Sequence, residues 1–302
     1  MSLPCIHIII PHFGSMALLY EALVSFRKQE YAMKKIIVVN NQPEKHFDDD
    51  FSKIFPDVSV LHTSENLGWP GACNYAVQNL NISKDDIILL TNNDVIIPDP
   101  QLLDKMISKY FSNPVQPCVV GPSVYHFSEP EKIHNAGWTL FEKSKTTFNN
   151  CRNEYEGDFR NETVDYVSGC FMMFPNAVIE KTGLLDETFF MYAEDADFCY
   201  TSWKSYIPVF CDSELKILHH IGGEAGSSSS FREYYISRNI YLFLEKHKDH
   251  PQYNYFLSLQ IKKDRKRVLG LFFRGVEWKL RSAVLDGIRD GRKGVKGLTR
   301  KP

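Results

Sequence analysis

The stretch DDIILLTNNDV, residues 85–95, contains the two features that decide the predicted fold. Its apolar run 87–90 is continuous rather than alternating, which is typical of a strand covered on both faces of a sheet. The sequence then turns polar at 91–94, and the segment DPQLLDKMISKYF (99–111), with helical spacing of apolar residues, follows. A buried strand, a polar end and a helix in this order predict an α/β unit.

The chain before this stretch has the same order of strands and helices. The apolar runs CIHIIIPHF (5–13), KKIIVVNNQ (34–42) and VSVLHT (58–63) are predicted strands, and 15–29 and 70–80 are predicted helices. We therefore predict an α/β fold with a doubly wound, mostly parallel sheet flanked by helices. In such a sheet, ligands bind beyond the carboxyl ends of the strands.

Polar side chains fall at those ends of the predicted strands. His12 follows the first strand, Asn40 and Asn41 follow the second, and TNND (91–94) follows the fourth. These positions predict a site that is built from several loops.

The second half of the chain is less regular. The predicted strands there are 164–174, 207–212 and 214–220, and the predicted helices are 175–183, 194–205 and 231–247. A flexible segment, GGEAGSSSS (222–230), precedes the last of these helices.

Charge divides the chain into an acidic body and a basic tail. Residues 261–302 contain fourteen Lys or Arg against four Asp or Glu, a net charge of +10, so the rest of the 302-residue chain carries −12. This asymmetry indicates a catalytic body with an appendage that meets a membrane surface or a nucleic acid. Because the body is acidic and has no aromatic, basic sheet face, we expect no nucleic-acid partner.

Cysteine usage and hydropathy indicate the compartment. The seven cysteines are scattered and form no CxxC pair, which favours reduced thiols in a cytoplasmic protein. The sequence shows no secretory leader and no apolar segment of about 18 residues. We expect a protein that is neither secreted by that route nor membrane-spanning.

Two segments in the first half could bind a ligand. Adjacent Asn and Asp side chains in TNNDV (91–95) can offer oxygen ligands to a divalent cation that bridges a diphosphate, or they can simply make a turn. ENLGWPGACNYA (65–76) places glycines at a helix start, where a backbone can approach an anion, although an ordinary loop with Trp69 in the core fits as well. The sequence has neither GxGxxG nor a P-loop, so a metal would have to help bind phosphate.

Two further segments in the second half carry titratable groups. EDAD (194–197) brings three carboxylates together, either as ordinary charges at a helix N-terminus or as a general base with its neighbours. His219 and His220 follow a predicted strand and are either structural or a source of one metal ligand.

Eight segments in order resemble the family 2 glycosyltransferases, which have the nucleotide-binding GT-A fold, and especially their bacterial rhamnosyltransferase and galactofuranosyltransferase branch. The resemblance spans roughly residues 5–245. The segments are IIIPHF, IIVVNNQ, SENLGWPGACNYA, LLTNNDV, VDYVSGCFMMF, GLLDETFFMYAEDADFCYTSW, LHHIGG and YYISRNIYLF.

This resemblance implies a metal site and a catalytic base. Asp94 matches the main metal-binding carboxylate of a DxD-like motif, with His219 as a further metal or diphosphate ligand unless His220 takes that place. Asp195 matches the catalytic base, with Glu194 beside it. The implied cofactor is Mg²⁺ or Mn²⁺.

The resemblance also implies a set of donor-binding residues. Pro11, Phe13 and Asn40 match positions that line the base and ribose. Asn66, Gly68, Trp69 and Asn74 match positions that face the diphosphate and sugar. Asn92 and Asn93 match the two remaining places of the DxD-like motif, and Arg238 matches a basic residue after the flexible segment. The family often has aspartate at positions 40, 92 and 93.

The implied activity is inverting transfer of a sugar, with rhamnose favoured, from a dTDP- or UDP-sugar to a hydroxyl of a lipid-linked, cell-surface glycan. The alternatives are a family member that binds a sugar nucleotide without transferring it, and a sugar nucleotidyltransferase. The latter would need a glycine-rich basic signature that IIIPHFGSM (8–16) lacks.

We expect a GT-A domain over 1–250 and a basic, amphipathic helical extension over 251–302. The extension mixes basic residues with apolar ones, which suits a helix lying on the anionic inner face of the cell membrane. The other interpretation is a helix packed on the body or on a second copy in a homo-oligomer.

Overall fold

The computed structural model describes residues 3–300, except 46, 48–49, 138–139, 141–161, 221–228 and 274. Cys151, Asp48 and Asp49 and most of the segment 222–230 therefore lie outside the described residues. The six described cysteines are all free.

The first four predicted strands form a parallel half-sheet, as expected. β1 (Ile6–His12) lies between β2 (Lys34–Asn40) and β4 (Ile87–Thr91), and β3 (Val58–His62) pairs with β2. All these pairings are parallel, so the carboxyl ends of the four strands meet at one edge.

Beyond β4 the sheet becomes mixed. β9 (Phe171–Pro175) is antiparallel to β4, and β6 (Val119–His126) is antiparallel to β9. β10 (Val209–His219) runs parallel to β6 and ends against the short β5 (Val95–Ile96). The full order is β3-β2-β1-β4-β9-β6-β10-β5, with β7 (Ile133–Asn135) on β6 and β8 (Glu162–Val164) on β10.

Two details of the second half differ from the sequence-based prediction. The predicted strands 207–212 and 214–220 are one strand, β10, whose register shifts between Asp212 and Lys216. The predicted strand 164–174 is two strands, because β8 ends at Val164 and β9 begins at Phe171. The segment between them contains Tyr166 and Gly169, which donate hydrogen bonds to Asp195.

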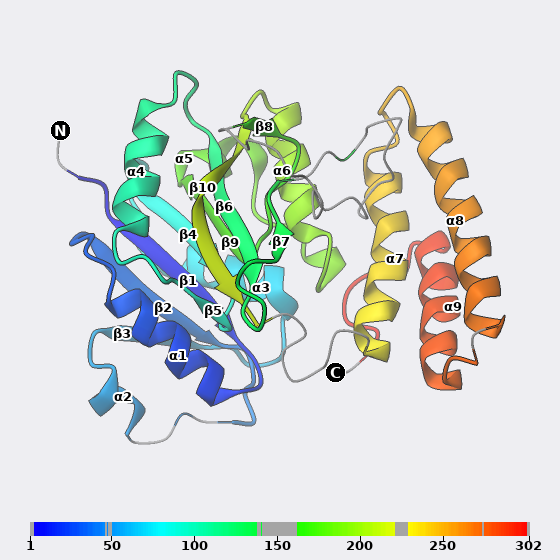
Figure 1. Ribbon diagram of the computed structural model, residues 1–302, viewed down its shortest axis with the longest axis horizontal. Helices are drawn as coiled ribbons and strands as arrows, with labels where there is room; N and C mark the ends of the chain where they lie inside the picture. Colours follow the sequence, from blue (N-terminus) through cyan, green and yellow to red (C-terminus); the bar gives the residue numbers. More distant parts are fainter. Residues whose placement is uncertain are drawn as a thin grey trace.

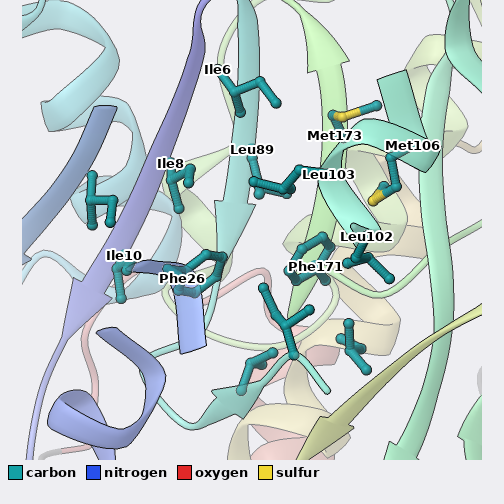
Figure 2. Close-up of a cluster of buried hydrophobic side chains, with 14 of the residues drawn as sticks. Ile6, Ile8, Ile10, Phe26, Leu89, Leu102, Leu103, Met106, Phe171 and Met173 are labelled. Atoms are coloured by element: carbon teal, nitrogen blue, oxygen red, sulfur yellow. The ribbon is translucent and has the colours of Figure 1, made fainter. Parts of the chain in front are cut away.

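Helices cover both faces of the sheet, which explains why the strands are apolar throughout. α1 (Met16–Arg27), α2 (Phe51–Ile54) and α4 (Leu102–Ser112) cover one face. On that face, Ile6, Ile8 and Ile10 of β1 pack with residues of β4, β9, α1 and α4 (Figure 2).

The opposite face carries its own helices. Ile9 of β1 and Ile88 and Leu90 of β4 pack there against α3 (Gly68–Asn79) and α6 (Glu194–Lys204). α5 (Ala177–Thr182) contributes Val178 to the same cluster. Because both faces of the sheet are buried, the strand residues that point to either face are apolar, and the strands read as continuous apolar runs.

Three helices complete the chain and stand beside one another in Figure 1, at the side of the body. They are α7 (Ser230–Lys246), α8 (Tyr253–Phe273) and α9 (Trp278–Arg292). α9 lies very close to α7, since a Cβ at Gly287 would come within 2.4 Å of the carbonyl oxygen of Tyr234. The apolar side of α9 is thus used for packing on the body, which was the second of the two interpretations of the tail.

None of the helices that the structure describes combines the length and apolarity needed to cross a bilayer.

Candidate active site

The polar residues at the carboxyl ends of the strands lie together, as the sequence predicts. Nδ2 of Asn93, after β4, lies 2.9 Å from Nδ1 of His12 at the end of β1. Nδ2 of Asn92 lies 3.3 Å from Nε2 of His219 at the end of β10. Burial, with a smaller effect of Lys45, lowers the pKa of His12 to about 4, so its imidazole is neutral near pH 7. The site therefore draws on strands from both halves of the sheet.

The side chains of Asp94 and His219 lie next to each other, as two ligands of one divalent cation would. Oδ1 of Asp94 lies 3.0 Å from Nε2 of His219, and this carboxylate oxygen is buried without a hydrogen bond. Carboxylate and imidazole are common ligands of such cations, and the remaining ligands can come from diphosphate oxygens and water. Within the described ranges, no group of three or more His, Cys, Asp or Glu side chains could hold a metal. The residues therefore fit a metal that is shared with a phosphorylated ligand.

His220 lies in a different environment. Its ring stacks on Phe127 at 3.6 Å between centroids, and its Nε2 lies 3.5 Å from Oε2 of Glu21. His219 is thus the histidine whose side chain adjoins the carboxylate of Asp94, and His220 contacts Asp94 through its backbone N–H.

Asn41 organises the loop before α3. Its Nδ2 donates to Oδ1 of Asn66 at 3.1 Å and to the carbonyl of Gly68 at 3.0 Å, while its Oδ1 accepts from the backbone N–H of Leu67 at 2.9 Å. Asn40, the neighbouring donor-site candidate, is buried, and its Nδ2 donates to the carbonyl of Lys45 at 2.8 Å. The two asparagines therefore shape the loops around the strand ends.

The other candidates for the base and ribose positions belong to β1. Pro11 is buried within the strand and pairs with Val39. Phe13 follows the strand and is 38% exposed, and its carbonyl lies 3.4 Å from Nδ2 of Asn93. Phe13 thus offers an exposed ring at the same edge.

The start of α3 is fitted against Phe190. The backbone N–H of Trp69 donates to the carbonyl of Phe190 at 2.9 Å. Gly68 has a φ of +71°, and a Cβ there would lie 2.1 Å from the Phe190 oxygen. Only glycine accommodates both this backbone conformation and this contact.

Trp69 also reaches the catalytic-base candidate. A Cβ at Gly169 would lie 2.9 Å from Cβ of Asp195 and 3.0 Å from Cη2 of Trp69, so both side chains pack on this glycine. The indole Nε1 of Trp69 is buried and has no hydrogen bond. The loop entering α3 therefore adjoins the carboxylate of Asp195.

Asp195 is held by three hydrogen bonds. Its Oδ2 accepts from the hydroxyl of Tyr166 at 2.7 Å and from the N–H of Gly169 at 2.9 Å, and its Oδ1 accepts from the N–H of Ala196 at 2.8 Å. Burial raises the pKa of Asp195, and these hydrogen bonds oppose that rise. A partly desolvated, firmly oriented carboxylate with a raised pKa suits general-base chemistry.

The other two acids of EDAD have distinct surroundings. Glu194 is buried with its Oε2 unpartnered, and burial followed by the charge of Asp195 raises its pKa well above the ordinary value. Asp197 is 2% exposed, and its carboxylate pairs with Nζ of Lys246 at 2.7 Å and Nε2 of His247 at 2.8 Å. Three neighbouring acids are tolerated because one is hydrogen-bonded, one is driven towards its neutral form and one is ion-paired.

A strained turn precedes these acids, and Asn239 supports it. Phe190, Tyr192 and Ala193 have φ values of 64°, 69° and 77°, which non-glycine residues rarely adopt. Nδ2 of Asn239 lies within hydrogen-bonding distance of the carbonyls of Phe189, Met191 and Tyr192, at 3.0, 2.7 and 2.6 Å. These contacts help the protein maintain the strain that places Glu194 and Asp195 at the start of α6.

Arg238 does not face the strand-end site in this structure. It is 0% exposed, and its guanidinium donates to the carbonyls of Phe189 at 2.7 Å and Gly297 at 2.6 Å and to Oγ1 of Thr299 at 3.1 Å. Its donors are therefore used to join α7, the strained turn and the C-terminal residues. The structure gives it a supporting role instead of the expected contact with diphosphate.

Asn74 is likewise used inside the protein. Its Nδ2 donates to the carbonyl of Leu185 and to Oε1 of Glu187, both at 2.8 Å, and its Oδ1 accepts from the N–H of Leu185 at 3.1 Å. It fastens α3 to the segment that leads into the strained turn, where the 3-10 helix Glu187–Phe189 lies.

Sequence reasoning overlooked Tyr166 and Gly169 as contributors to the site, and it matched Asn239 only as the amide beside Arg238. Tyr166 and Gly169 lie in VDYVSGCFMMF (164–174), which had been assigned to a strand throughout. A glycine and a serine within that run were the available signal, since both interrupt strands. The role of Asn239 on the strained turn had no signal, because its three acceptors lie about 50 residues away in the chain.

Comparisons with known proteins bear on the family and the fold of the chain. The model of the family described as Glycosyl transferase family 2 matches residues 7–183, which is more than half of the chain. An uncharacterized protein of Haemophilus influenzae is 26% identical over 113 residues, covering 36% of this chain and 60% of that protein. A low-salt glycan biosynthesis hexosyltransferase of Haloferax volcanii is 32% identical over 80 residues, or 26% of either chain. The matched stretches thus span less than two thirds of these relatives.

Solved structures show the same fold. A mannosyltransferase from Pyrobaculum calidifontis, in complex with GDP-Man and Mn²⁺, has a TM-score of 0.57 at 12% identity, over 96% of this chain and 87% of that chain. S. aureus TarS, in complex with UDP-GlcNAc, has a TM-score of 0.59 at 18% identity, over 96% of this chain and 81% of that chain. The predicted GT-A fold is therefore confirmed.

Proposed function

The chain belongs to glycosyl transferase family 2, and from this premise we propose that it transfers a sugar from a nucleoside diphosphate to a hydroxyl acceptor, with inversion at the anomeric carbon. One observation carries the proposal. The N–H of Gly169 donates to Asp195, and the carbonyl of the next residue, Cys170, accepts from the N–H of Asn92 at 3.2 Å. Two successive residues thus join the candidate base to the segment that bears Asp94.

Asp195 would act as the general base. An acceptor hydroxyl is a weak nucleophile at neutral pH, so removal of its proton by this carboxylate assists attack on the anomeric carbon. The hydrogen bonds from Tyr166 and Gly169 orient the carboxylate, and the oxygen–carbon bond forms as the bond to the diphosphate breaks on the opposite face. A single displacement of this kind inverts the configuration.

Asp94 and His219 would hold Mg²⁺ or Mn²⁺, which supplies positive charge to stabilise the leaving diphosphate. Trp69, next to Asp195, would border the sugar, and Phe13 would border the nucleoside. The mannosyltransferase neighbour was solved with Mn²⁺, which supports the choice of metal.

The favoured donor is a dTDP-sugar such as dTDP-rhamnose, with a UDP-sugar next. The solved neighbours hold GDP-Man and UDP-GlcNAc, so a nucleotide-sugar donor has support while the nucleotide stays open to test. The proposed acceptor is a growing, lipid-linked, cell-surface glycan, and the proposed location is the cytoplasmic face of the cell membrane. A homo-oligomer is compatible with this proposal.

Two measurements test the proposal together. Thermal stabilisation by dTDP-, UDP- and GDP-sugars, each with and without Mn²⁺, reports donor binding, and release of the nucleoside diphosphate with acceptor reports transfer. We expect Asp195→Asn to lower transfer by about 10²-fold to 10⁴-fold while keeping the thermal shift with donor. The control Asp104→Asn, at an exposed position on α4, should change neither measurement.

The outcomes separate the alternatives. A wild-type protein that shows a donor shift but no transfer with any acceptor would favour the non-catalytic binding protein. An Asp195→Asn variant that turns over at the wild-type rate would refute the assignment of the base. Formation of a nucleotide sugar from a nucleoside triphosphate would indicate the nucleotidyltransferase alternative.

A further inference from the structure

The connection between α8 and α9 presents a group of exposed apolar side chains. Leu269, Phe272 and Phe273 at the end of α8 are 58%, 51% and 87% exposed, and Trp278 at the start of α9 is 67% exposed. The guanidinium carbon of Arg281 lies 5.3 Å from the ring centroid of Phe272 and 6.0 Å from that of Trp278. Arg281 therefore joins the two helix ends into one patch. We call these four apolar residues the hairpin tip.

Four exposed basic residues on α8 and α9 have no acidic partner among the described residues, and one exposed acid, Glu277, precedes Trp278. Lys262, Arg265 and Lys266 on α8 and Lys279 on α9 are exposed and form no ion pair within the described part of the chain. The only acidic residue of α8, Asp264, is 4% exposed and accepts from Nε2 of Gln260 at 2.9 Å. Because this acid faces inward, the outward charge of α8 is positive.

From this combination we propose that the hairpin tip docks the protein on an anionic lipid bilayer. Aromatic rings favour the interface between headgroups and acyl chains, and exposed Lys and Arg residues are attracted to anionic headgroups. The arrangement differs from the amphipathic helix expected from the sequence. The apolar residues of α9, including Val284 and Ile288, are buried against the body, so the ends of two helices contact lipid instead of the length of one.

The hairpin tip is better suited to a membrane than to a second copy of the chain. At about 150–250 Å² for a fully exposed aromatic side chain, its four residues offer roughly 500 Å² of surface, below the roughly 800 Å² per partner of a stable interface. The unpaired positive charge on α8 would also oppose the meeting of two identical tips.

The hairpin tip is placed so that the docked protein could act on a membrane-bound substrate. In Figure 1, the connection between α8 and α9 and the carboxyl end of β1 both lie towards the lower side of the view. Docking through the tip would bring the strand-end site towards the bilayer. This step rests on the proposed transfer to a lipid-linked acceptor, whereas the docking itself does not.

Vesicle flotation of the full chain tests the docking without donor or acceptor. We expect binding to phosphatidylcholine vesicles that contain phosphatidylglycerol, at least ten-fold weaker binding to pure phosphatidylcholine, and weaker binding at high salt. The double variant Phe273→Ser/Trp278→Ser should lose at least ten-fold in binding. The matched control Phe111→Ser/Tyr206→Ser removes aromatic residues that are 50% and 95% exposed elsewhere and should bind as the wild type does.

Equal binding of the tip variant and the wild type would overturn the proposal, as would wild-type binding that ignores lipid charge. Light scattering during size-exclusion chromatography adds a second check. A dimer that the tip variant converts to a monomer would assign the surface to a second copy of the chain. The donor-induced thermal shift should be the same in wild type and tip variant, so failure of the transfer proposal can be distinguished from failure of the docking proposal.

Discussion

The hydroxyl of Tyr166 donates a 2.7 Å hydrogen bond to Oδ2 of Asp195, the same oxygen that accepts the N–H of Gly169. Burial raises the pKa of Asp195, and the bonds from Gly169 and Tyr166 work against that rise. The pKa of the candidate base is therefore set by a balance that one substitution can shift.

Replacing Tyr166 with Phe removes one of the opposing bonds and should raise the pKa of Asp195 further. Because the base acts as a carboxylate, the acidic limb of the pH profile of kcat/KM should move to higher pH, and activity at pH 6 should fall more than activity at pH 8. Tyr206→Phe, at a tyrosine that is 95% exposed, provides the control. An acidic limb that stays in place or moves to lower pH would contradict the role of Tyr166.

The fit of Gly68 against Phe190 gives a second prediction. In Gly68→Ala, the new Cβ would meet the Phe190 oxygen at 2.1 Å in addition to the strain of a φ of +71°. We expect a loss of unfolding free energy of more than about 3 kcal/mol and a weaker thermal shift with donor. Gly294→Ala is a matched control, since Gly294 has the same φ and a Cβ there has nothing within 4 Å.

Denaturant unfolding of both glycine variants measures the difference. The control should lose only about 1–2 kcal/mol, the usual cost of placing a side chain in the left-handed region. Similar losses in both variants would show that the contact with Phe190 is unimportant.

Asn239 should be essential to the strained turn before α6. Asn239→Ala leaves the carbonyls of Phe189, Met191 and Tyr192 without this donor and should cost about 2–4 kcal/mol of unfolding free energy. At temperatures well below the melting point, kcat should still fall, because Asp195 follows the turn. Asn79→Ala, at an exposed asparagine whose Nδ2 donates to the carbonyl of Tyr75, should change either value little.

Lys246 should be needed to balance Asp197. Lys246→Met removes a cation that lies 2.7 Å from both Asp186 and Asp197 and should destabilise the protein by about 2–4 kcal/mol at pH 7. Lys248→Met, whose lysine pairs with Glu245 at the surface, should cost less than about 1 kcal/mol.

The effect of Lys246→Met should depend on pH. Burial would raise the pKa of Asp186, but its hydrogen bonds from Lys246 and Thr188 outweigh this effect and lower it. A lowered pKa in the folded state stabilises the protein above the ordinary aspartate pKa of about 3.9 and is lost as the pH falls through the folded value. The difference in stability between wild type and variant should therefore shrink in acid.

The sequence alone determined the parts of this protein that depend on local patterns. Continuous apolar runs placed β1 to β4 within a few residues, because a strand that is buried on both faces has few polar positions. Helical spacing of apolar residues likewise placed α1, α3 and α4, whereas the one-turn helix α2 was not predicted. The order of short motifs gave the family, and their position after strands gathered His12, Asn93 and Asp94 at one edge.

Only the tertiary structure decided what Arg238, Asn74 and the basic tail contribute. A motif identifies which residue type stands at a position. Whether a guanidinium such as that of Arg238 binds ligand or stabilises the fold depends on which acceptors the tertiary structure places near it. For Arg238 those acceptors lie about 50 residues before it, at Phe189, and about 60 after it, at Gly297. Hydrogen bonds act over roughly 3 Å, whereas such separations along the chain are closed only when distant elements pack together, and no local pattern records that packing.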